Sequence, residues 1–443
     1  MNKITVDVSR TGGAIKPVNA VNNGPSGSSV RGITNFEYYR ALEIPYARNH
    51  DASFYSVYGG EHTVDVHRIF KNFDADETDP ASYVFAPTDR YTQTILAAGT
   101  KVFYRLGASI EHGYKEGTYP PRDYLKWARI CEHIIRHYTE GWANGFTYDI
   151  EYWEIWNEPD CINPDGSNPC WQGTEAEFID FYCTAATYLK EKFPHLKIGG
   201  PAFASVSETK QFAIDFLREV KRRNATLDFF SFHGYLKDPQ KMLDRTNAAQ
   251  ELLADAGLSG VELHYNEWNY VRAWLGEDYQ YSRIQSKRLK GASLIASVMC
   301  VGQASPLDML MYYDARPCSW CGLFDTDMLF PLKPYYTFYL FRELRRLGTH
   351  IPTDYRVGNV YNCAATDGRS AAVILSNYSD DDSAPAESLT LSLQNLPAKA
   401  TLEIYTLDED HDGELTETRE ISGDTELTLT VPLFTTLLVK INA

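Results

Sequence analysis

Two glutamates, Glu158 and Glu267, each stand at the end of an expected strand and together could cleave a glycosidic bond. Pro159 follows Glu158 and cannot continue a strand ladder, so the carboxylate is left at the strand's end. Glu267 follows the run Glu262–Asn266, 109 residues after Glu158. Hydrolysis of a glycoside with retention of configuration needs a carboxylic acid to protonate the leaving oxygen and a carboxylate about 5 to 5.5 Å away to attack the anomeric carbon. We therefore expect Glu158 to be the general acid/base and Glu267 to be the nucleophile.

The elements that must position this pair alternate between short β-rich runs and longer segments with helical periodicity, a pattern typical of parallel βα units. Eight runs are expected to be strands: Pro17–Val21, Ile44–Arg48, Lys101–Leu106, Tyr152–Trp156, Lys197–Gly200, Leu227–His233, Glu262–Asn266 and Met309–Tyr313. Helices are expected over Pro121–Tyr138, Thr174–Phe193, Ser207–Arg223, Gln240–Ala256, Tyr281–Val301 and Pro334–Leu347. Eight such units in residues 16–350 indicate an α/β fold, a (β/α)8 TIM barrel whose fourth and seventh strands face each other across the mouth.

A second, smaller domain is expected after the barrel, over residues 351–443. The helical pattern ends there, and short alternating runs separated by turn signals predict an accessory C-terminal β-sandwich. Its expected strands are Ala371–Ser376, Leu389–Leu393, Leu402–Thr406, Leu427–Val431 and Thr435–Ile441. Residues 1–15 contain one more alternating run, Ile4–Ser9, which could pair with this sandwich.

The formal net charge of −17 argues against nucleic acids and anionic membranes as partners, because both favour basic surfaces. Residues 351–443 carry 16 acidic and 5 basic side chains, so much of the charge belongs to the expected sandwich. The apolar stretches are far shorter than the roughly 20 residues of a membrane-spanning helix. A neutral oligosaccharide is the partner that fits, and the sequence leaves open whether the chain forms a homo-oligomer.

No glycine-rich motif for phosphates or dinucleotides follows an expected strand, so we expect no cofactor. Eight cysteines are too few for a disulfide scaffold and match no complete zinc motif. Cys318 and Cys321 form a lone Cys-x-x-Cys, which we expect to be two loop thiols rather than a metal site. Disulfides between these two, or between Cys161 and Cys170, are left open. The first ten residues do not resemble a secretory signal, so we expect a cytoplasmic protein, or a secreted or periplasmic one if a signal has been removed.

Several segments resemble glycoside hydrolase family 39, a family of retaining barrel enzymes, and its β-xylosidases in particular. They span most of the chain and include Glu154-Ile-Trp-Asn-Glu-Pro-Asp160, Leu196-Lys-Ile-Gly-Gly-Pro-Ala202, Phe232-His-Gly-Tyr235, Lys333-Pro-Tyr-Tyr336 and Val431-Pro-Leu-Phe434. The resemblance implies an exo-acting glycoside hydrolase that works on oligosaccharides by double displacement, with β-xylosides as the expected substrates.

The resemblance also implies which residues bind the sugar. Asn157 would hydrogen-bond the 2-hydroxyl, while His233 and Tyr235 would position the sugar and the nucleophile. His50, in a segment similar to the family's Arg-x-His element, would hold another hydroxyl. A histidine or tyrosine at a strand end is often only a packing residue. The expected position of His50, His233 and Tyr235 together at the barrel mouth is what favours a role in sugar binding.

The sequence departs from the xylosidase pattern beside the nucleophile, where Asn-Glu267-Trp stands in place of an expected Thr-Glu-Phe. A pocket specific for xylose must refuse the hydroxymethyl group of a hexose, and the side chains expected to do so are Trp268, Tyr312 and Trp320. The departure leaves galactosidase, arabinosidase, α-L-iduronidase and endo-glycanase activities open. A carbohydrate-binding protein on an inactive barrel is disfavoured because both carboxylates are present.

Overall fold

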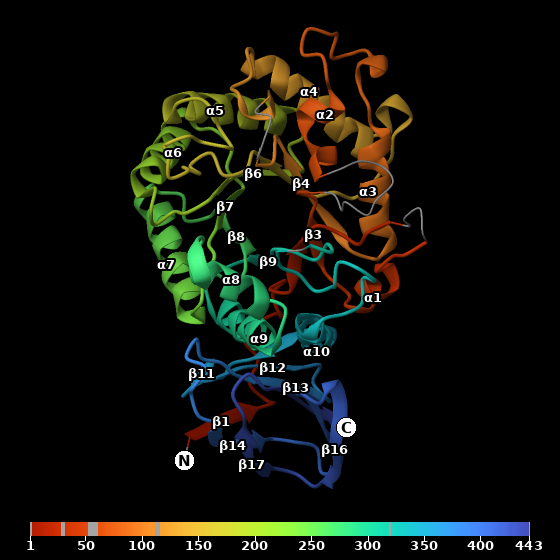
Figure 1. Ribbon diagram of the computed structural model, residues 1–443, viewed down its shortest axis with the longest axis vertical. Coiled ribbons are helices and arrows are strands. Elements are labelled where there is room, and N and C mark those ends of the chain that lie inside the picture. The colour runs from red at the N-terminus through yellow and green to blue at the C-terminus, as the bar shows by residue number, and fades with distance from the viewer. Residues whose placement is uncertain (1, 28–31, 52–60, 111–115, 319, 443) are drawn as a thin grey trace.

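The computed structural model of the protein describes residues 2–27, 32–51, 61–110, 116–318 and 320–442. A barrel surrounded by helices occupies one end of the elongated molecule, and layered strands occupy the other (Figure 1). Both chain termini lie at the layered end. Within the described ranges, no helix has the length and apolar character to cross a membrane.

Eight parallel strands of the described chain form a closed barrel. They are β2 (Ala20–Asn22), β3 (Tyr46–Arg48), β4 (Lys101–Leu106), β5 (Tyr152–Ile155), β6 (Lys197–Phe203), β7 (Phe229–His233), β8 (Glu262–Trp268) and β9 (Met309–Tyr312). Each strand pairs with the next, and β9 pairs with β2 to close the barrel. The predicted TIM barrel is therefore confirmed, and each predicted strand overlaps an observed one.

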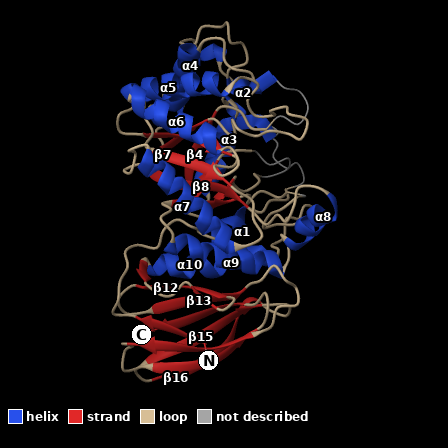
Figure 2. Cartoon of the chain, turned by 90° about the vertical axis from the view of Figure 1, so that its left-hand side faces the viewer, coloured by secondary structure: helices blue, strands red, loops and turns tan. Residues whose placement is uncertain are grey.

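Helices surround the barrel and cover the outer faces of its strands (Figure 2). They are α1 (Phe36–Ala41), α2 (Val66–Ile69), α3 (Ala86–Ala97), α4 (Tyr124–Thr139), α5 (Glu175–Lys192), α6 (Lys210–Arg223), α7 (Pro239–Asp255), α8 (Gly276–Gln285), α9 (Leu289–Ala304) and α10 (Lys333–Leu347). Short 3-10 helices cover Glu61–Val64, Pro80–Ser82, Glu116–Thr118 and Trp142–Asn144.

The single helix expected over Tyr281–Val301 is wrong, because α8 and α9 are separate helices. Arg288 between them is extended, with ψ at −173°, so the chain changes direction there. Figure 2 shows α9 lying directly above the layered strands while α8 projects to one side. α9 is therefore buried, whereas α8 is largely exposed. No proline or glycine separates the two helices in the sequence.

The strands of the barrel alternate between side chains that face its interior and side chains that face the helices. In the half of the barrel nearest the strand starts, the interior is filled by a buried cluster of Ala20, Phe103, Tyr152, Phe229, Met309 and Met311. Two residues further along β5 and β7, the inward positions become polar, at Glu154 and Ser231. This apolar filling closes one end of the barrel, so the chemistry must take place at the other.

Two sheets form the second domain and share one apolar core. One sheet contains β1 (Asn2–Asp7), β14 (Glu387–Gln394) and β17 (Thr425–Val431). The other contains β10 (Thr349–Ile351), β11 (Arg356–Val357), β12 (Val360–Thr366), β13 (Ala371–Asn377), β15 (Ala400–Leu407), β16 (Asp412–Ile421) and β18 (Thr436–Asn442). The expected β-sandwich is present, and α9 and α10 of the barrel pack against its strands β12 and β13.

The first strand of the chain belongs to this sandwich and not to the barrel. β1 runs parallel to β14, with Asn2 opposite Leu389 and Asp7 opposite Gln394. The inward side chains Ile4 and Val6 are buried in the sandwich core. The alternating run at the N-terminus thus pairs with the other end of the chain.

Candidate active site

The end of β5 carries Glu158 to the mouth of the barrel. Beyond Ile155 the backbone adopts positive φ angles at Trp156 (78°) and at Glu158 (48°), which interrupt the alternation of the strand. Trp156 therefore packs outward against Phe181 of α5. The Glu158 N–H donates to the carbonyl of Ala202 at the end of β6, at 2.8 Å. This turn fixes the backbone of Glu158 at the carboxyl ends of the strands, where TIM barrels perform their chemistry.

Glu267 reaches the same mouth through an irregularity in β8. The strand has one extra residue relative to β9, because Tyr265 pairs with Leu310 while Trp268 pairs with Tyr312. The register shifts likewise against β7, where His233 pairs with Glu267. The extra residue places Glu267 toward the interior and Trp268 toward the helices. A bulge of this kind commonly aims a side chain into an active site.

The two carboxylates lie close together, with His233 between them. Oxygens of Glu158 and Glu267 and a ring nitrogen of His233 all lie within 4.8 Å of one another. His233 Nδ1 is 2.9 Å from Glu158 Oε1 and 3.5 Å from Glu267 Oε2. Burial lowers the pKa of His233, so its ring is neutral near pH 7. A retaining glycosidase needs a pair this close, whereas an inverting pair stands about 6.5 to 9.5 Å apart.

Glu267 receives the stronger hydrogen-bond donors of the two carboxylates. The Tyr235 hydroxyl donates to its Oε1, and Arg48 Nη1 lies 3.3 Å from its Oε2. Burial raises the pKa of Glu267, while the Arg48 guanidinium and the hydrogen bond from Tyr235 oppose that rise. A guanidinium and a phenol both stabilise the charged form, so this carboxylate suits a nucleophile.

Glu158 lies in a less polar setting. Its Oε2 is 3.8 Å from the thiol of Cys170, a weak donor, and its Oε1 contacts His233. Burial raises the pKa of Glu158 to about 7, although Arg48 lowers it somewhat. A carboxyl group that holds its proton near neutral pH can act as a general acid.

Arg48 and Glu154 form a buried ion pair beneath Glu158 and Glu267. Arg48 Nε donates to Glu154 Oε2 at 2.6 Å, and neither side chain has any exposed surface. The other oxygen of Glu154 accepts from Ser231 Oγ at 2.6 Å and from Asn266 Nδ2 at 2.5 Å. The carboxylate of Glu154 is therefore saturated and acts as an anchor for Arg48. Sequence reasoning missed both roles, although Arg48 begins the Arg-x-His segment that contains His50, and Glu154 is a glutamate inside an otherwise buried strand.

Asn157 and His233 each keep one polar atom available to a ligand. Arg48 Nη2 donates to Asn157 Oδ1 at 2.7 Å, which fixes the amide orientation and leaves its Nδ2 without a partner among the described residues. His233 Nε2 is buried and likewise has no hydrogen-bond partner in the described part of the chain. A buried polar atom is rarely left unpaired, so His233 Nε2 is the strongest candidate to bind a sugar hydroxyl, and Asn157 Nδ2 is a second.

His50 lies beside the site and is held by a separate ion pair. Arg105 Nε donates to His50 Nδ1 at 3.3 Å, and Arg105 itself pairs with Asp65 at 2.5 Å. Burial and the nearby arginines hold the pKa of His50 well below its usual range. The neutral ring places Nε2 3.7 Å from Asp51 Oδ2. Since Nδ1 is engaged, Nε2 is the atom of His50 that could meet a hydroxyl group.

Aromatic side chains form one wall of the mouth. The Trp320 ring lies 5.4 Å from the ring of Tyr235, edge to face, and stacks 5.8 Å from the ring of Trp274. Trp274 is 54% exposed, so its face is open to solvent. Tyr235 donates to Glu267, and this wall therefore begins at the nucleophile and extends outward.

The expectation that Trp268 and Tyr312 contact the sugar does not fit their positions. Both rings are fully buried and pack edge to face against each other, and Tyr312 packs on Phe338 of α10. The shift in β8 turns Trp268 out of the barrel, and Tyr312 alternates outward with Leu310. Among the three bulky residues proposed from the sequence, only Trp320 lies at the mouth.

The family is decided by comparison with known sequences. A model of the family described as glycosyl hydrolases family 39 matches residues 2–261, which is more than half of the 443 residues. The chain belongs to glycosyl hydrolases family 39. The matched region contains Glu158 and ends six residues before Glu267.

Among curated relatives, this family-39 chain is similar to a β-xylosidase from Geobacillus stearothermophilus, with 25% identity over 231 residues. That alignment covers 45% of this chain and 44% of the relative, so the match spans less than half of the relative's length. The fold is similar to that of a glucosidase from Croceicoccus marinus, with TM-score 0.84, 20% identity and coverage of 100% and 99% of the two chains. It is also similar to a monomeric β-xylosidase from Caulobacter crescentus, with TM-score 0.69, 16% identity and coverage of 100% and 99%.

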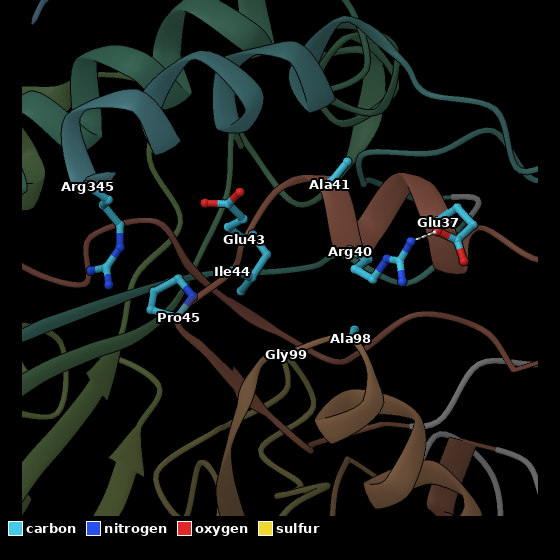
Figure 3. Close-up of a pocket in the computed structure, with 9 residues that line it drawn as sticks. All are labelled: Glu37, Arg40, Ala41, Glu43, Ile44, Pro45, Ala98, Gly99 and Arg345. Carbon is cyan, nitrogen blue, oxygen red and sulfur yellow. Dashed lines mark ion pairs between the residues drawn. The ribbon is translucent and has the colours of Figure 1, made fainter. Parts of the chain in front are cut away.

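The family-39 chain has a further pocket at the opposite end of the barrel (Figure 3). Its lining includes Pro45 and Gly99, which precede β3 and β4, and the guanidinium of Arg345 from α10. Its acidic lining residues, Glu37 and Glu43, are exposed or paired with surface arginines. This pocket lacks the converging carboxylates of the mouth, so we assign the candidate active site to the mouth.

Proposed function

We propose that this chain is a retaining, exo-acting β-glycosidase that removes sugar residues from oligosaccharides. The observation that carries the proposal is the approach of Glu158 and Glu267 to within 4.8 Å, with different donors around each carboxylate. Membership of family 39 supports the same assignment. The residues of the mouth supply the acid, the nucleophile and the hydrogen bonds that such a reaction requires.

In the first step, Glu158 donates its proton to the glycosidic oxygen while Glu267 attacks the anomeric carbon. The bond from that carbon to the leaving oxygen breaks, a glycosyl ester forms on Glu267, and the alcohol departs. Arg48 and Tyr235 hold the attacking oxygens of Glu267 in place. Positioning of this kind converts a slow encounter into a fast reaction within one complex.

In the second step, Glu158 has lost its proton and removes one from a water molecule. The water oxygen attacks the anomeric carbon from the face that the first alcohol left, and Glu267 departs as a carboxylate. Two inversions at one carbon restore its original configuration. The pKa of about 7 for Glu158 suits both duties, since the group can give and accept a proton near neutral pH.

A small external nucleophile tests the role of Glu267. Glu267→Ala should lose nearly all turnover, because no attacking group remains, and azide should restore activity on an activated aryl β-glycoside by entering the vacated space. One displacement inverts the anomeric carbon, so NMR should identify the α-glycosyl azide. Glu262→Ala, at the start of the same strand and far from the mouth, is the control that needs no azide. A β-azide, or near wild-type turnover of Glu267→Ala, would contradict the assignment.

For the sugar we propose xylose, as the names of the curated relatives suggest. Trp320, in the wall beside Tyr235, is the bulky side chain that would refuse a hydroxymethyl group. Initial rates on aryl β-xyloside, β-glucoside, β-galactoside, α-L-arabinosides and α-L-iduronide should give at least about tenfold higher kcat/KM for the xyloside. A preference for the glucoside would replace the xylosidase proposal and leave the roles of the two glutamates intact.

A further inference from the structure

The loop that leads from β9 to α10 brings a carboxylate to the two cysteines Cys318 and Cys321. In sequence these thiols have the spacing of half a zinc site and no second pair. In the structure a carboxylate oxygen of Asp314 joins them, and the three ligand atoms lie within 4.8 Å of one another. Cys321 and Asp314 are buried. The fold therefore assembles three metal-binding groups where spacing revealed two.

Asp314 is oriented as a metal ligand would be. Its Oδ2 accepts hydrogen bonds from Arg316 Nε at 2.8 Å and from Asn23 Nδ2 at 2.9 Å. Its Oδ1 is buried and has no hydrogen-bond partner within the ranges that the structure describes. A buried carboxylate oxygen without a partner is costly. Ligating carboxylates are typically held in this way, by donors to one oxygen while the other binds the ion.

We propose that Asp314, Cys318 and Cys321 bind a soft divalent cation of the zinc type. Tetrahedral zinc with thiolate ligands at about 2.3 Å and an oxygen ligand near 2.1 Å places its ligand atoms roughly 3.5 to 3.8 Å apart. The three atoms need to move by less than about 1 Å each to reach that geometry. Sulfur ligands select zinc over magnesium or calcium, which prefer oxygen alone. A water molecule would complete the fourth position.

A bound ion would offset much of the negative charge of the cluster. Two thiolates and one carboxylate contribute three negative charges, and a divalent cation neutralises two of them. The guanidinium of Arg316, buried and hydrogen-bonded to Asp314, adds a positive charge that it shares with the buried carboxylate of Asp51 at 3.4 Å. Without the ion, deprotonating both thiols beside a buried carboxylate would leave an unbalanced charge in a medium of low dielectric constant.

Two other groups of suitable side chains occur among the described residues, and both fit an ion less well. In the group of Glu158, Cys161 and Cys170, both oxygens of Glu158 already contact another side chain, His233 or Cys170. The group of the two catalytic glutamate candidates and His233 lies against the cation of Arg48, whose Nη1 is 3.3 Å from Glu267 Oε2. Neither group offers the unpartnered carboxylate oxygen that Asp314 provides.

Binding at this cluster would fix part of the mouth. Trp320 stands between the two cysteines in sequence, and its ring contacts Tyr235 and Trp274. Anchoring both neighbouring thiols to one ion would hold the Trp320 backbone against the aromatic wall. The site itself is proposed independently of any glycosidase activity, because its ligands and its test involve no substrate.

Cobalt substitution tests the site directly. Protein purified under reducing conditions and freed of metal by a chelator is titrated with Co2+, and the visible and near-ultraviolet spectra are recorded. A tetrahedral thiolate site should give a thiolate-to-cobalt charge-transfer band, intense d–d bands and a stoichiometry of one ion per chain, and Zn2+ should displace the cobalt. Cys318→Ser and Cys321→Ser should each remove the charge-transfer band or reduce it by about half. Asp314→Asn should weaken binding at least about tenfold.

Two control variants identify which thiols hold the ion. Cys161→Ser alters the competing group near Glu158, and Cys183→Ser alters a buried cysteine of α5 outside all three groups. Both should keep the full cobalt spectrum, and far-ultraviolet circular dichroism should verify that every variant is folded. A wild-type protein that gives no thiolate band would overturn the proposal. So would a band that keeps its full intensity in Cys318→Ser or disappears in Cys161→Ser, or loss of two titratable thiols to a disulfide under the reducing conditions.

Discussion

At the scale of single residues, the site assigns different work to two chemically identical carboxyl groups. Glu267 is contacted by Arg48 and Tyr235, whereas Glu158 has a thiol and an imidazole beside it. Glu267 is buried and the Glu158 side chain is only 14% exposed, and this burial raises the pKa of each. In the proposed mechanism, the environment of each group therefore decides which one keeps its proton and which one attacks, as in other enzymes that separate two carboxyl groups by their surroundings.

The pKa of about 7 for Glu158 predicts how the rate depends on pH. Glu158 must be protonated to act on the bound substrate, so kcat/KM should fall as pH rises through about 7. The acidic limb at lower pH belongs to Glu267, which must be ionised. The profile of the wild-type enzyme on an aryl glycoside checks both limbs. Glu158→Gln, assayed with an activated leaving group, should lose the basic limb, and a limb that persists there would belong to another residue.

Leaving groups of different basicity test the acid itself. Glu158→Ala removes the proton donor, so it should slow a natural disaccharide by about 100-fold or more. A dinitrophenyl glycoside has a leaving group that needs little protonation, and its first step should be far less affected. Steady-state kcat/KM on both substrates gives the comparison. Equal losses would mean that Glu158 does not protonate the leaving oxygen.

The sequence allowed prediction of the two glutamates of the candidate site and of the polar residues at the ends of the barrel strands. Glu158 and Glu267 stand out because a proline or an aromatic follows each at a strand end. The roles of Arg48 and Glu154 were not predicted, because the sequence does not show which buried charged side chains pair inside the barrel. Trp268 was misplaced because one extra residue in β8 reverses the face on which it lies.

At the scale of elements, the turn after β4 supports the turn that carries Glu158. Gly107 follows β4 with φ at 116°, and an added Cβ would lie 2.8 Å from Cε3 of Trp156 and 3.0 Å from its Cα. The backbone of Trp156 is also bonded to Leu106, whose carbonyl accepts its N–H at 2.8 Å. Any movement of Trp156 would pass directly to Glu158, two residues away.

Gly107→Ala should therefore reduce kcat by at least about tenfold, since shifts near 1 Å in an active site can cost about 100-fold. Gly99→Ala is the matched control, because Gly99 also has a positive φ, at 81°, but nothing lies within 4 Å of an added Cβ. Both variants carry the strain of a left-handed backbone, about 1 kcal/mol. Only Gly107→Ala should lose activity when both are assayed at a temperature where each is folded. Equal kcat values would show that Trp156 does not transmit the displacement.

The barrel strands were well predicted because their burial makes them apolar, whereas the equally buried β12 of the sandwich was not predicted. Parallel barrel strands are buried on both faces and appear in the sequence as short apolar runs, so all eight were found. β16 was missed because most of its side chains are exposed and charged, which leaves little alternation. The break between α8 and α9 was missed because Ser286 and Arg288 carry no strong signal for a helix end.

At the scale of the whole molecule, one buried lysine joins the barrel to the sandwich. Lys290 of α9 is 1% exposed, and its Nζ donates to the carbonyl of Asp380 at 2.6 Å and to Asp382 Oδ1 at 2.8 Å. Both aspartates lie in the turn between β13 and β14. The aspartates are partly exposed, so solvent screening reduces the energy of the pair.

Lys290→Met keeps the apolar stem and removes the charge that these contacts require. We expect the free energy of unfolding to fall by about 2 kcal/mol, because hydrogen bonds to a charged donor are lost and their acceptors stay close to the buried helix. Urea denaturation followed by fluorescence measures the change. Lys241→Met removes a surface ion pair with Asp244 at 3.3 Å and should cost less than about 0.5 kcal/mol. Equal effects of the two substitutions would mean that Lys290 does not tie the domains together.

The pairing of β1 with β14 constrains how the chain can be made. Asn2 is synthesised 387 residues before its partner Leu389. At about 5 to 20 residues per second, the first strand waits roughly 20 to 80 s before the strand it must join exists. Throughout that interval Ile4 and Val6 have no sandwich core to enter, although the residues of the barrel are already synthesised. The barrel therefore has to begin folding with a loose apolar end beside it, and a chain that stops before β14 would keep that end exposed to chaperones and proteases.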